Sequence, residues 1–141
     1  MAKSITNSTG TPALFIKADL ARPEDCAKTV TETEAKFGKV QVLVNAGAST
    51  ERGTIIDTTP DQFDAMFATN VRGPFFLMQA AIRSMIKNGI EGAICNIGST
   101  SAMAGQPFIS AYCASKGALA TLTANTAFAV MGNRIRVNQL N

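Results

Sequence analysis

The sequence predicts a single α/β domain of 141 residues, in which about four parallel strands form part of a doubly wound sheet with flanking helices. Short apolar runs rich in β-branched residues alternate along the chain with longer segments of helical periodicity. Strands that are separated by helices pair in parallel through right-handed crossovers. A hydrophobic fraction of 46% and a charged fraction of 16% are those of a globular protein with a buried core.

The first part of the chain contains a tail, a strand, a helix and a second strand. Residues 1–11 are rich in Ser, Thr and Asn, which predicts a flexible tail, and the apolar residues 13–17 predict a short strand. A helix begins at Pro23, where acidic residues follow in the first turn, and ends at Gly38. Residues 40–44 are nearly all apolar, as in a buried parallel strand.

A long helix is predicted from Thr59, which caps it, to about Lys87, with an interruption at Gly73 and Pro74. Pro74 has no N–H to donate to the carbonyl of Asn70, so the helix is expected to kink there. Alternatively, Pro74 opens a second helix and Asn70 lies in a turn before it. The local sequence leaves both interpretations open.

The last part of the chain predicts a strand, a helix and a further strand. Residues 93–97 form the central strand, residues 110–131 a helix, and residues 134–138 begin one more strand. One side of this helix carries Ala, Gly, Ser and Thr, which allows close packing against another helix. Residues 98–106 are small, and we expect them to form the floor of a substrate pocket.

Charge and cysteine patterns exclude several classes of function. The net charge of +3 comes from scattered basic residues without interleaved aromatic ones, so nucleic-acid binding is not expected. The spacing of the three cysteines, Cys26, Cys95 and Cys113, is not that of metal ligands and indicates reduced thiols of a cytoplasmic protein. The sequence contains no His, which excludes most kinds of zinc site. Residues 1–11 lack the apolar core of a secretory signal, and the uncharged run 92–115 is too polar to span a membrane.

Tyr112 and Lys116 are the first candidate site residues. They are four apart in the predicted helix, so their side chains lie on one face. A nearby ammonium favours the phenolate, and such a tyrosine can exchange a proton with a substrate hydroxyl or carbonyl. Ser99 follows the central strand, where open α/β sheets place catalytic groups. Taken alone, the pair also fits a structural role, a half-buried tyrosine beside a lysine that extends to solvent.

Several motifs then occur in one order and spacing. They are the segment Leu43-Val44-Asn45-Ala46-Gly47, the segment Thr69-Asn70-Val71-Arg72-Gly73, the strand end Asn96-Ile97-Gly98-Ser99 and the run AYCASKGAL at 111–119. Together they resemble the classical short-chain dehydrogenases/reductases, over residues 13–138 but only the middle of that family's domain. The resemblance implies a Rossmann-like fold and an oxidoreductase that transfers a hydride between NAD or NADP and a carbonyl or secondary-alcohol substrate.

The resemblance assigns four catalytic residues. Tyr112 is the general acid/base, and Lys116 assists its ionisation and contacts the nicotinamide ribose. Ser99 hydrogen-bonds the substrate oxygen, and Asn70 holds a proton-relay water. Cys113 is interpreted as a small buried residue rather than a nucleophile, because the sequence has no His to act as its base.

Cofactor contacts also follow from the resemblance. The cofactor-binding candidates are Asp19, Asn45, Ala46, Gly47, Ile97, Tyr112 and Lys116. Asp19 matches a residue that contacts the adenine, although it can also cap the loop before the first helix. The Asn-Ala-Gly turn lies on the adenosine ribose side and partly holds the sheet together. Ile97 lies under the nicotinamide, although a core position explains it equally well.

The family's cofactor signature, TGxxxGxG after a first strand, does not occur in the sequence. We therefore expect an internal part of the family's domain without the turn that holds the pyrophosphate, and weak or undetectable binding of NAD(P)H. The strand at 40–44 is left with an open edge, which residues 13–17 or another chain could cover.

The alternative function is that of a non-catalytic remnant of such an enzyme. The helices at 75–87 and 111–131 carry apolar and small-residue faces. In the family these two helices commonly form an oligomer interface, so we expect a homo-oligomer in either case. A remnant would act at most as an oligomerising module.

Overall fold

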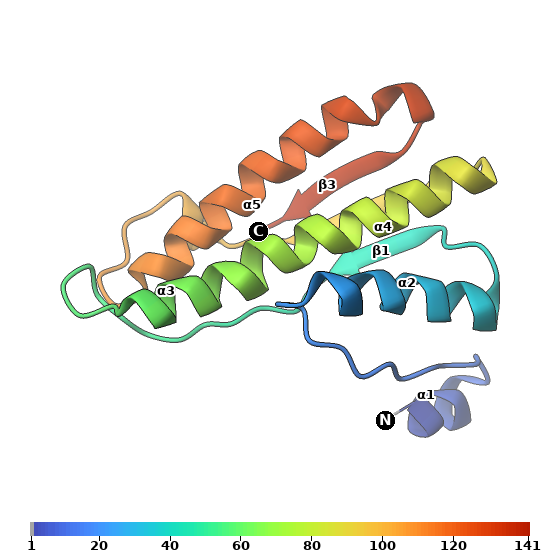
Figure 1. The fold of residues 1–141 in the computed structure, drawn as a ribbon, viewed down its shortest axis with the longest axis horizontal. Helices are drawn as coiled ribbons and strands as arrows, with labels where there is room; N and C mark the ends of the chain where they lie inside the picture. The colour runs from blue at the N-terminus through green and yellow to red at the C-terminus, as the bar shows by residue number, and fades with distance from the viewer. Residues whose placement is uncertain (1) are drawn as a thin grey trace.

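The computed structural model describes residues 2–141, and a sheet of three parallel strands runs through it (Figure 1). The strands are β1 (Val42–Asn45), β2 (Ala93–Ile97) and β3 (Arg136–Leu140), in that order. Val44 pairs with Cys95, and Cys95 pairs with Asn138, so the carboxyl ends of all three strands lie at one edge. The predicted α/β sheet is confirmed, with three strands instead of about four.

Helices cover one face of this sheet (Figure 1). They are α2 (Pro23–Phe37), α4 (Gly73–Asn88) and α5 (Ser110–Ala129), whereas α3 (Pro60–Phe67) lies beyond the end of the strands and contacts α5. Short 3-10 turns, η2 (Thr100–Ala102) and η3 (Met131–Asn133), flank α5. The core between the helices and the sheet contains Val30, Met78, Ala81, Met85, Ile94, Val130, Ile135 and Val137. None of the helices between residues 2 and 141 is long and apolar enough to cross a bilayer.

The opposite face of the sheet carries no helix within residues 2–141. Along β1, Val42 is 62% exposed and Val44 is 56% exposed, whereas Asn45 is 6% exposed. Successive side chains of a strand point to opposite faces, so the two valines lie on the bare face. The buried side chains of Ile94 and Val137 pack in the core on the covered face.

Between α3 and α4 the chain forms a π-helical turn, η1 (Ala68–Arg72). The N–H of Gly73 donates to the carbonyl of Ala68, five residues earlier. The wider turn lets the chain remain helical up to Pro74, which lies in the first turn of α4. The predicted interruption is confirmed, and Asn70 lies within a helical turn rather than in an irregular connection.

The start of α3 has the cap that the sequence predicts. Thr59 Oγ1 accepts from the N–H of Gln62 at 3.2 Å, and Gln62 Oε1 accepts from the N–H of Thr59 at 3.0 Å. The two residues therefore satisfy each other's free backbone donors as a capping box.

Two expectations for the N-terminal segment are wrong. Residues 13–17 do not form a strand, because an isolated run gains no ladder hydrogen bonds and no segment between residues 2 and 141 pairs with it. Leu14 and Phe15 are 44% and 67% exposed. Residues 2–9, expected to be part of a tail, form the helix α1 (Ala2–Thr9), which buries none of its side chains. The N–H of Ala13 donates to Thr6 Oγ1 and links this helix to the following segment.

Candidate active site

The predicted catalytic residues come from three elements that meet at the carboxyl edge of the sheet. Ser99 follows β2, Asn70 lies in η1, and Tyr112 and Lys116 lie in the first two turns of α5. The Nζ atom of Lys116 donates to the carbonyl oxygen of Ile97 at 2.6 Å. This bond places the ammonium group at the end of β2, two residues before Ser99.

Lys116 is buried, with 4% of its surface exposed, and forms no ion pair with any residue in 2–141. Its Nζ atom lies 5.7 Å from the centre of the Tyr112 ring, so the two side chains share one face of α5 as predicted. Desolvation by burial lowers the pKa of Lys116 below its usual value. An ammonium that is buried without a counter-charge destabilises the fold, and such groups are common at functional sites.

Ser99 lies in extended backbone and caps the turn η2. Its Oγ atom accepts from the N–H of Ser101 at 3.2 Å and lies 2.7 Å from the Ser101 Oγ atom. Ser101 is itself 6% exposed, so it holds the Ser99 hydroxyl from the protein side. Ser101 was not predicted as a site residue, although a second serine two positions after Ser99 is visible in the sequence.

Asn70 is 1% exposed, and its side chain is occupied by protein partners. Its Oδ1 atom accepts from the N–H of Ser49 at 2.7 Å, and its Nδ2 atom donates to the Ser49 carbonyl at 2.8 Å. The same Nδ2 atom lies 3.0 Å from Ser115 Oγ. The amide therefore ties η1 to the loop after β1 and to α5.

The Asn-Ala-Gly turn follows the end of β1. Asn45 is buried, and its Nδ2 atom donates to Asn96 Oδ1 at 2.8 Å, which joins β1 to β2. The Oδ1 atom of Asn45 has no hydrogen-bond partner in the described part of the chain. Ala46 and Gly47 are exposed at the carboxyl edge. A Cβ atom on Gly47 would lie 2.7 Å from the Leu20 side chain, so the segment before α2 packs closely against this turn.

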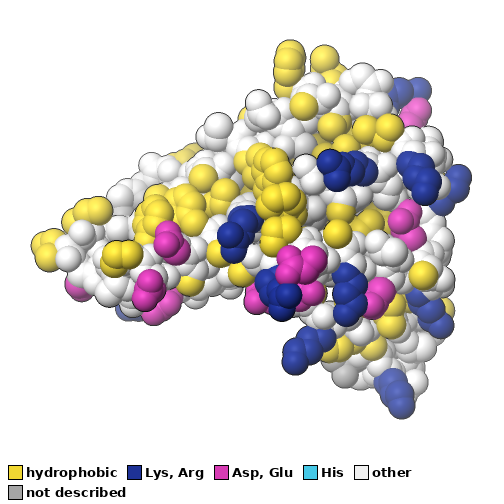
Figure 2. Space-filling view, in the orientation of Figure 1, with side chains coloured by type: hydrophobic (Ala, Val, Ile, Leu, Met, Phe, Trp, Pro, Cys, Tyr) yellow, Lys and Arg dark blue, Asp and Glu magenta, His cyan; other side chains and the backbone are white. Residues whose placement is uncertain are grey.

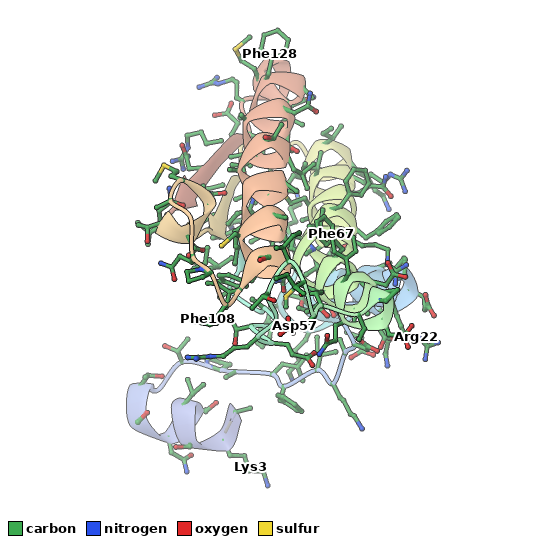
Figure 3. The ribbon with its side chains drawn as sticks, turned by 90° about the vertical axis from the view of Figure 1, so that its left-hand side faces the viewer. Lys3, Arg22, Asp57, Phe67, Phe108 and Phe128 are labelled. Carbon is green, nitrogen blue, oxygen red and sulfur yellow. The ribbon has the colours of Figure 1, made fainter. Side chains whose placement is uncertain are left out.

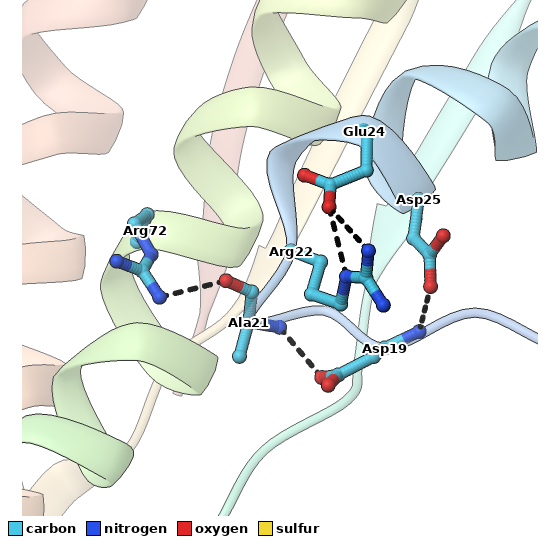
Figure 4. Close-up of polar contacts among 6 residues, drawn as sticks. All are labelled: Asp19, Ala21, Arg22, Glu24, Asp25 and Arg72. Atoms are coloured by element: carbon cyan, nitrogen blue, oxygen red, sulfur yellow. Dashed lines mark hydrogen bonds and ion pairs between the residues drawn. The ribbon is translucent and has the colours of Figure 1, made fainter.

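Asp19 lies in that same segment, and Figure 4 shows its contacts. Its Oδ1 atom accepts from the N–H of Ala21 at 2.9 Å, while its own N–H donates to Asp25 Oδ2 at 2.9 Å. The segment is fixed to η1 by a 2.7 Å bond from Arg72 to the Ala21 carbonyl. The capping role that the sequence left open for Asp19 is therefore present, and the loop lies close to Gly47.

Two loops adjoin the start of α5. The N–H of Gly53 donates to the carbonyl of Phe108 at 3.0 Å, and the N–H of Ser110 donates to the carbonyl of Gly53 at 3.1 Å. Phe108 and Asp57 are among the residues that line a hollow of about 160 Å³ between these loops. Figure 3 shows both side chains near the N-terminal end of α5. No pattern in the sequence predicts this pairing, because it joins segments more than fifty residues apart.

Some residues of this edge suit the hydroxyl groups of a nucleotide cofactor, and other parts of such a site do not occur. The buried Lys116 ammonium has donors left over for hydroxyl oxygens, and Ala46 and Gly47 carry no bulky side chain, although Leu20 packs against Gly47. A glycine-rich turn that would hold a pyrophosphate does not occur in the sequence. Within residues 2–141, no three His, Cys, Asp or Glu side chains gather in a way that could hold a metal ion.

Comparison with known proteins gives consistent matches. The family model described as short chain dehydrogenase matches residues 1–141. Sorbitol dehydrogenase from Cereibacter sphaeroides is 31% identical over 139 residues, which cover 99% of this chain and 54% of that protein. 2-(R)-hydroxypropyl-CoM dehydrogenase from Xanthobacter autotrophicus is 38% identical over 128 residues, covering 89% of this chain and 51% of that protein.

Solved structures agree with this result. The crystal structure of NAD+-bound xylitol dehydrogenase superposes with a TM-score of 0.91 at 30% identity, covering 98% of this chain and 53% of that one. A short-chain dehydrogenase from Streptomyces avermitilis gives a TM-score of 0.88 at 28% identity, covering 97% of this chain and 50% of that one. The chain therefore spans about half the length of the relatives that it matches.

Proposed function

Because the chain belongs to the short-chain dehydrogenase family, we propose that it supplies the proton-transfer site of an NAD- or NADP-dependent oxidoreductase that acts on a carbonyl or secondary alcohol. The observation that carries this proposal is Lys116, whose ammonium is buried without a counter-charge beside the ring of Tyr112. A structural lysine would gain stability by reaching solvent or a carboxylate, and Lys116 does neither.

Each residue of the site has a distinct role in this proposal. The phenol of Tyr112 gives a proton to the substrate oxygen in reduction and takes it back in oxidation. Lys116 holds its positive charge beside the Tyr112 ring, and Ser99 donates a hydrogen bond to the substrate oxygen. Asn70 keeps η1, the loop after β1 and α5 together, which supports the proposed water-holding role of this turn.

The nicotinamide cofactor, when bound, supplies or accepts the hydride. Lys116 and Tyr112 would contact its ribose, and the turn at Asn45, Ala46 and Gly47 would lie along the adenosine side, with Asp19 nearby and Ile97 below the nicotinamide. These contacts follow from the family resemblance. Since no residues of this chain supply a glycine-rich turn for the pyrophosphate, we expect weak or undetectable NAD(P)H binding by the 141 residues alone.

The substrate class follows from the relatives. Sorbitol dehydrogenase and xylitol dehydrogenase act, by their names, on polyols, and the hydroxypropyl-CoM dehydrogenase on a hydroxypropyl group. All three names describe an alcohol, so we propose a small alcohol or the corresponding carbonyl compound for this chain. The three free cysteines fit a reducing compartment such as the cytoplasm.

The direct test follows the absorbance of reduced nicotinamide with a panel of small ketones, for the wild type and for Tyr112→Phe, at millimolar NADH or NADPH so that weak cofactor binding still gives an occupied site. Turnover that Tyr112→Phe abolishes supports the proposal, since phenylalanine keeps the ring and removes only the hydroxyl. Equal rates in both proteins contradict the role of Tyr112. Low-micromolar NAD(P)H binding in a fluorescence titration contradicts the expected weak binding but leaves the proton-transfer role intact.

A second candidate function is that of a non-catalytic oligomerising module. An apolar hollow of about 300 Å³ lies between α4 and α5, where it is lined by Phe75, Met78, Ile82, Leu122 and Val130 among others. Phe75 is 43% exposed, and hydrophobic side chains gather on this face of the molecule (Figure 2). Exposed apolar patches of this kind mark interaction sites. A dimer in light scattering that Phe75→Asp converts to a monomer supports this interface, and a wild-type monomer contradicts it.

A further inference from the structure

Helix α5 packs on the rest of the protein through an unusual stripe. Its buried residues at four-residue spacing are Ala111, Ser115, Leu119 and Thr123, together with Lys116. Leu119 is the only large apolar side chain among them, and two of the others are hydroxyls. Leu122 and Ala127 add apolar contacts to the core but are only partly buried. The polar contacts of the stripe therefore contribute to the rotation of α5, which decides where Lys116 and Tyr112 point.

The first hydroxyl, Ser115, connects α5 to η1. Ser115 is fully buried, and its Oγ atom accepts from Asn70 Nδ2 at 3.0 Å. The same hydroxyl donates to the carbonyl of Tyr112, within its own helix, at 2.8 Å. A single side chain next to Lys116 is thus held by Asn70 and by the backbone of Tyr112.

The second hydroxyl, Thr123, connects α5 to the sheet in the same way. Its Oγ1 atom accepts from Asn96 Nδ2 at 2.8 Å and donates to the carbonyl of Leu119, within its own helix, at 2.7 Å. Asn96 in turn accepts from Asn45, so the connection continues to the end of β1. These three polar side chains are all at least nine-tenths buried.

We propose that Ser115 and Thr123 are positioning residues, which together fix the rotation and height of α5 so that Lys116 reaches the Ile97 carbonyl beside Tyr112. The two hydroxyls are eight residues apart, about 12 Å along the helix, on the same face, and Lys116 lies between them in the sequence. Together with the surface on which α5 packs, two such points limit both the rotation of the helix and its shift along its axis. The proposal rests on the proposed function only in that Lys116 and Tyr112 are taken to act in proton transfer. The positions of these two side chains can be tested without measuring turnover.

The test uses two readouts that report the site itself. The chain has one Tyr and no Trp, so the tyrosine band of the near-ultraviolet circular dichroism spectrum reports the packing of Tyr112. The rate of lysine acylation, measured by peptide mass spectrometry, reports whether Lys116 is still covered, with the exposed Lys87 as internal reference. Both measurements are made in the wild-type chain and its variants well below their unfolding temperatures.

The variants are Ser115→Ala and Thr123→Val, each of which removes one hydroxyl. Thr123→Ser, which keeps the hydroxyl, is the rescue control. Ser84→Ala is the matched control, because Ser84 is also a buried serine with an interhelical bond, to Glu34 at 2.5 Å, away from the site. Ser115→Ala is expected to fold, since Asn70 keeps its bonds to Ser49.

Both Ser115→Ala and Thr123→Val are expected to weaken the tyrosine band. Each is also expected to raise the acylation rate of Lys116 relative to Lys87 about fivefold, because losing one ordinary hydrogen bond makes local opening about that much more frequent. Ser84→Ala is expected to change only the unfolding midpoint, and Thr123→Ser to behave as the wild type. The proposal is overturned if Ser115→Ala and Thr123→Val change the tyrosine band and the acylation of Lys116 no more than Ser84→Ala does. It is also overturned if only one of the two positions gives a response. If Thr123→Val does not fold, Thr123→Ala takes its place, since alanine also removes the hydroxyl and favours the helix more than valine. A wild type with a strong tyrosine band and a protected Lys116 but no turnover contradicts only the proposed function.

Discussion

Replacing Lys116 by methionine is predicted to make the protein more stable while it removes the charge of the candidate site. Methionine has a similar length and fills the same buried space without an ammonium group. The structure gives the ammonium one hydrogen bond, at 2.6 Å to the Ile97 carbonyl, and no carboxylate within residues 2–141. The sign of the change depends on whether this bond outweighs the lost hydration of the charge.

The magnitudes favour methionine. A hydrogen bond to a charged group contributes about 1.5–3 kcal/mol, whereas desolvating an ammonium costs several kcal/mol, and replacing even a buried ion pair by apolar side chains is often neutral or stabilising by about 1–4 kcal/mol. We expect Lys116→Met to raise the free energy of unfolding by about 1–2 kcal/mol. For a chain of this length that corresponds to an increase of about 3–8 °C in the melting temperature.

The assay is urea and thermal unfolding at neutral pH, followed by far-ultraviolet circular dichroism. Lys87→Met, at an exposed position of α4, is the control and is expected to change the free energy of unfolding by less than about 0.5 kcal/mol. A loss of more than about 1 kcal/mol in Lys116→Met would refute the reasoning, because the ammonium would then be a stabilising structural group.

Three other predictions follow from the structure. Burial lowers the pKa of Lys116 in the folded protein. Between that lowered pKa and the ordinary lysine pKa of ~10.4, the unfolded chain binds more protons than the folded one, so the free energy of unfolding should rise with pH in this alkaline range. Unfolding experiments on Lys116→Met should lack this rise. Gly73→Ala should destabilise the fold by about 1–3 kcal/mol, because its Cβ atom would lie 2.8 Å from the Leu20 carbonyl oxygen. Gly105→Ala is the control and should not destabilise it, because a Cβ atom there meets nothing within 4 Å. Equal denaturation midpoints in the two variants would contradict the close approach of Leu20 to Gly73. Val44→Thr on the bare sheet face should cost less than about 0.5 kcal/mol in urea unfolding, and a core-sized loss would show that this face is covered.

Much of the fold could be predicted because its determinants are local. The apolar run that became β2 and the cap at Thr59 act through neighbouring residues, and both were confirmed. The proximity of Tyr112 and Lys116 needed only helical spacing. Pro74 correctly indicated an interrupted helix around Asn70, since the missing N–H is a property of the residue itself.

The errors and omissions concern contacts between distant segments. Residues 13–17 have the composition of a strand, but a strand also needs a neighbour, and the sequence of the segment does not contain that information. The partners of the Asn70 side chain, Ser49 and Ser115, lie 21 and 45 residues away, so no spacing rule identifies them. Ser101 was a different case, because its proximity to Ser99 was readable and was overlooked.

The central claim is that Ser99, Tyr112 and Lys116 form one site, and the ring protons of the single tyrosine test it directly. In a nuclear Overhauser spectrum of the chain, we predict cross-peaks from the Tyr112 ring to the side chains of both Lys116 and Ser99. Cross-peaks to Lys116 alone, with the serine side chain showing contacts elsewhere, would contradict the claim, since the two hydroxyls would then open to different sides of the molecule.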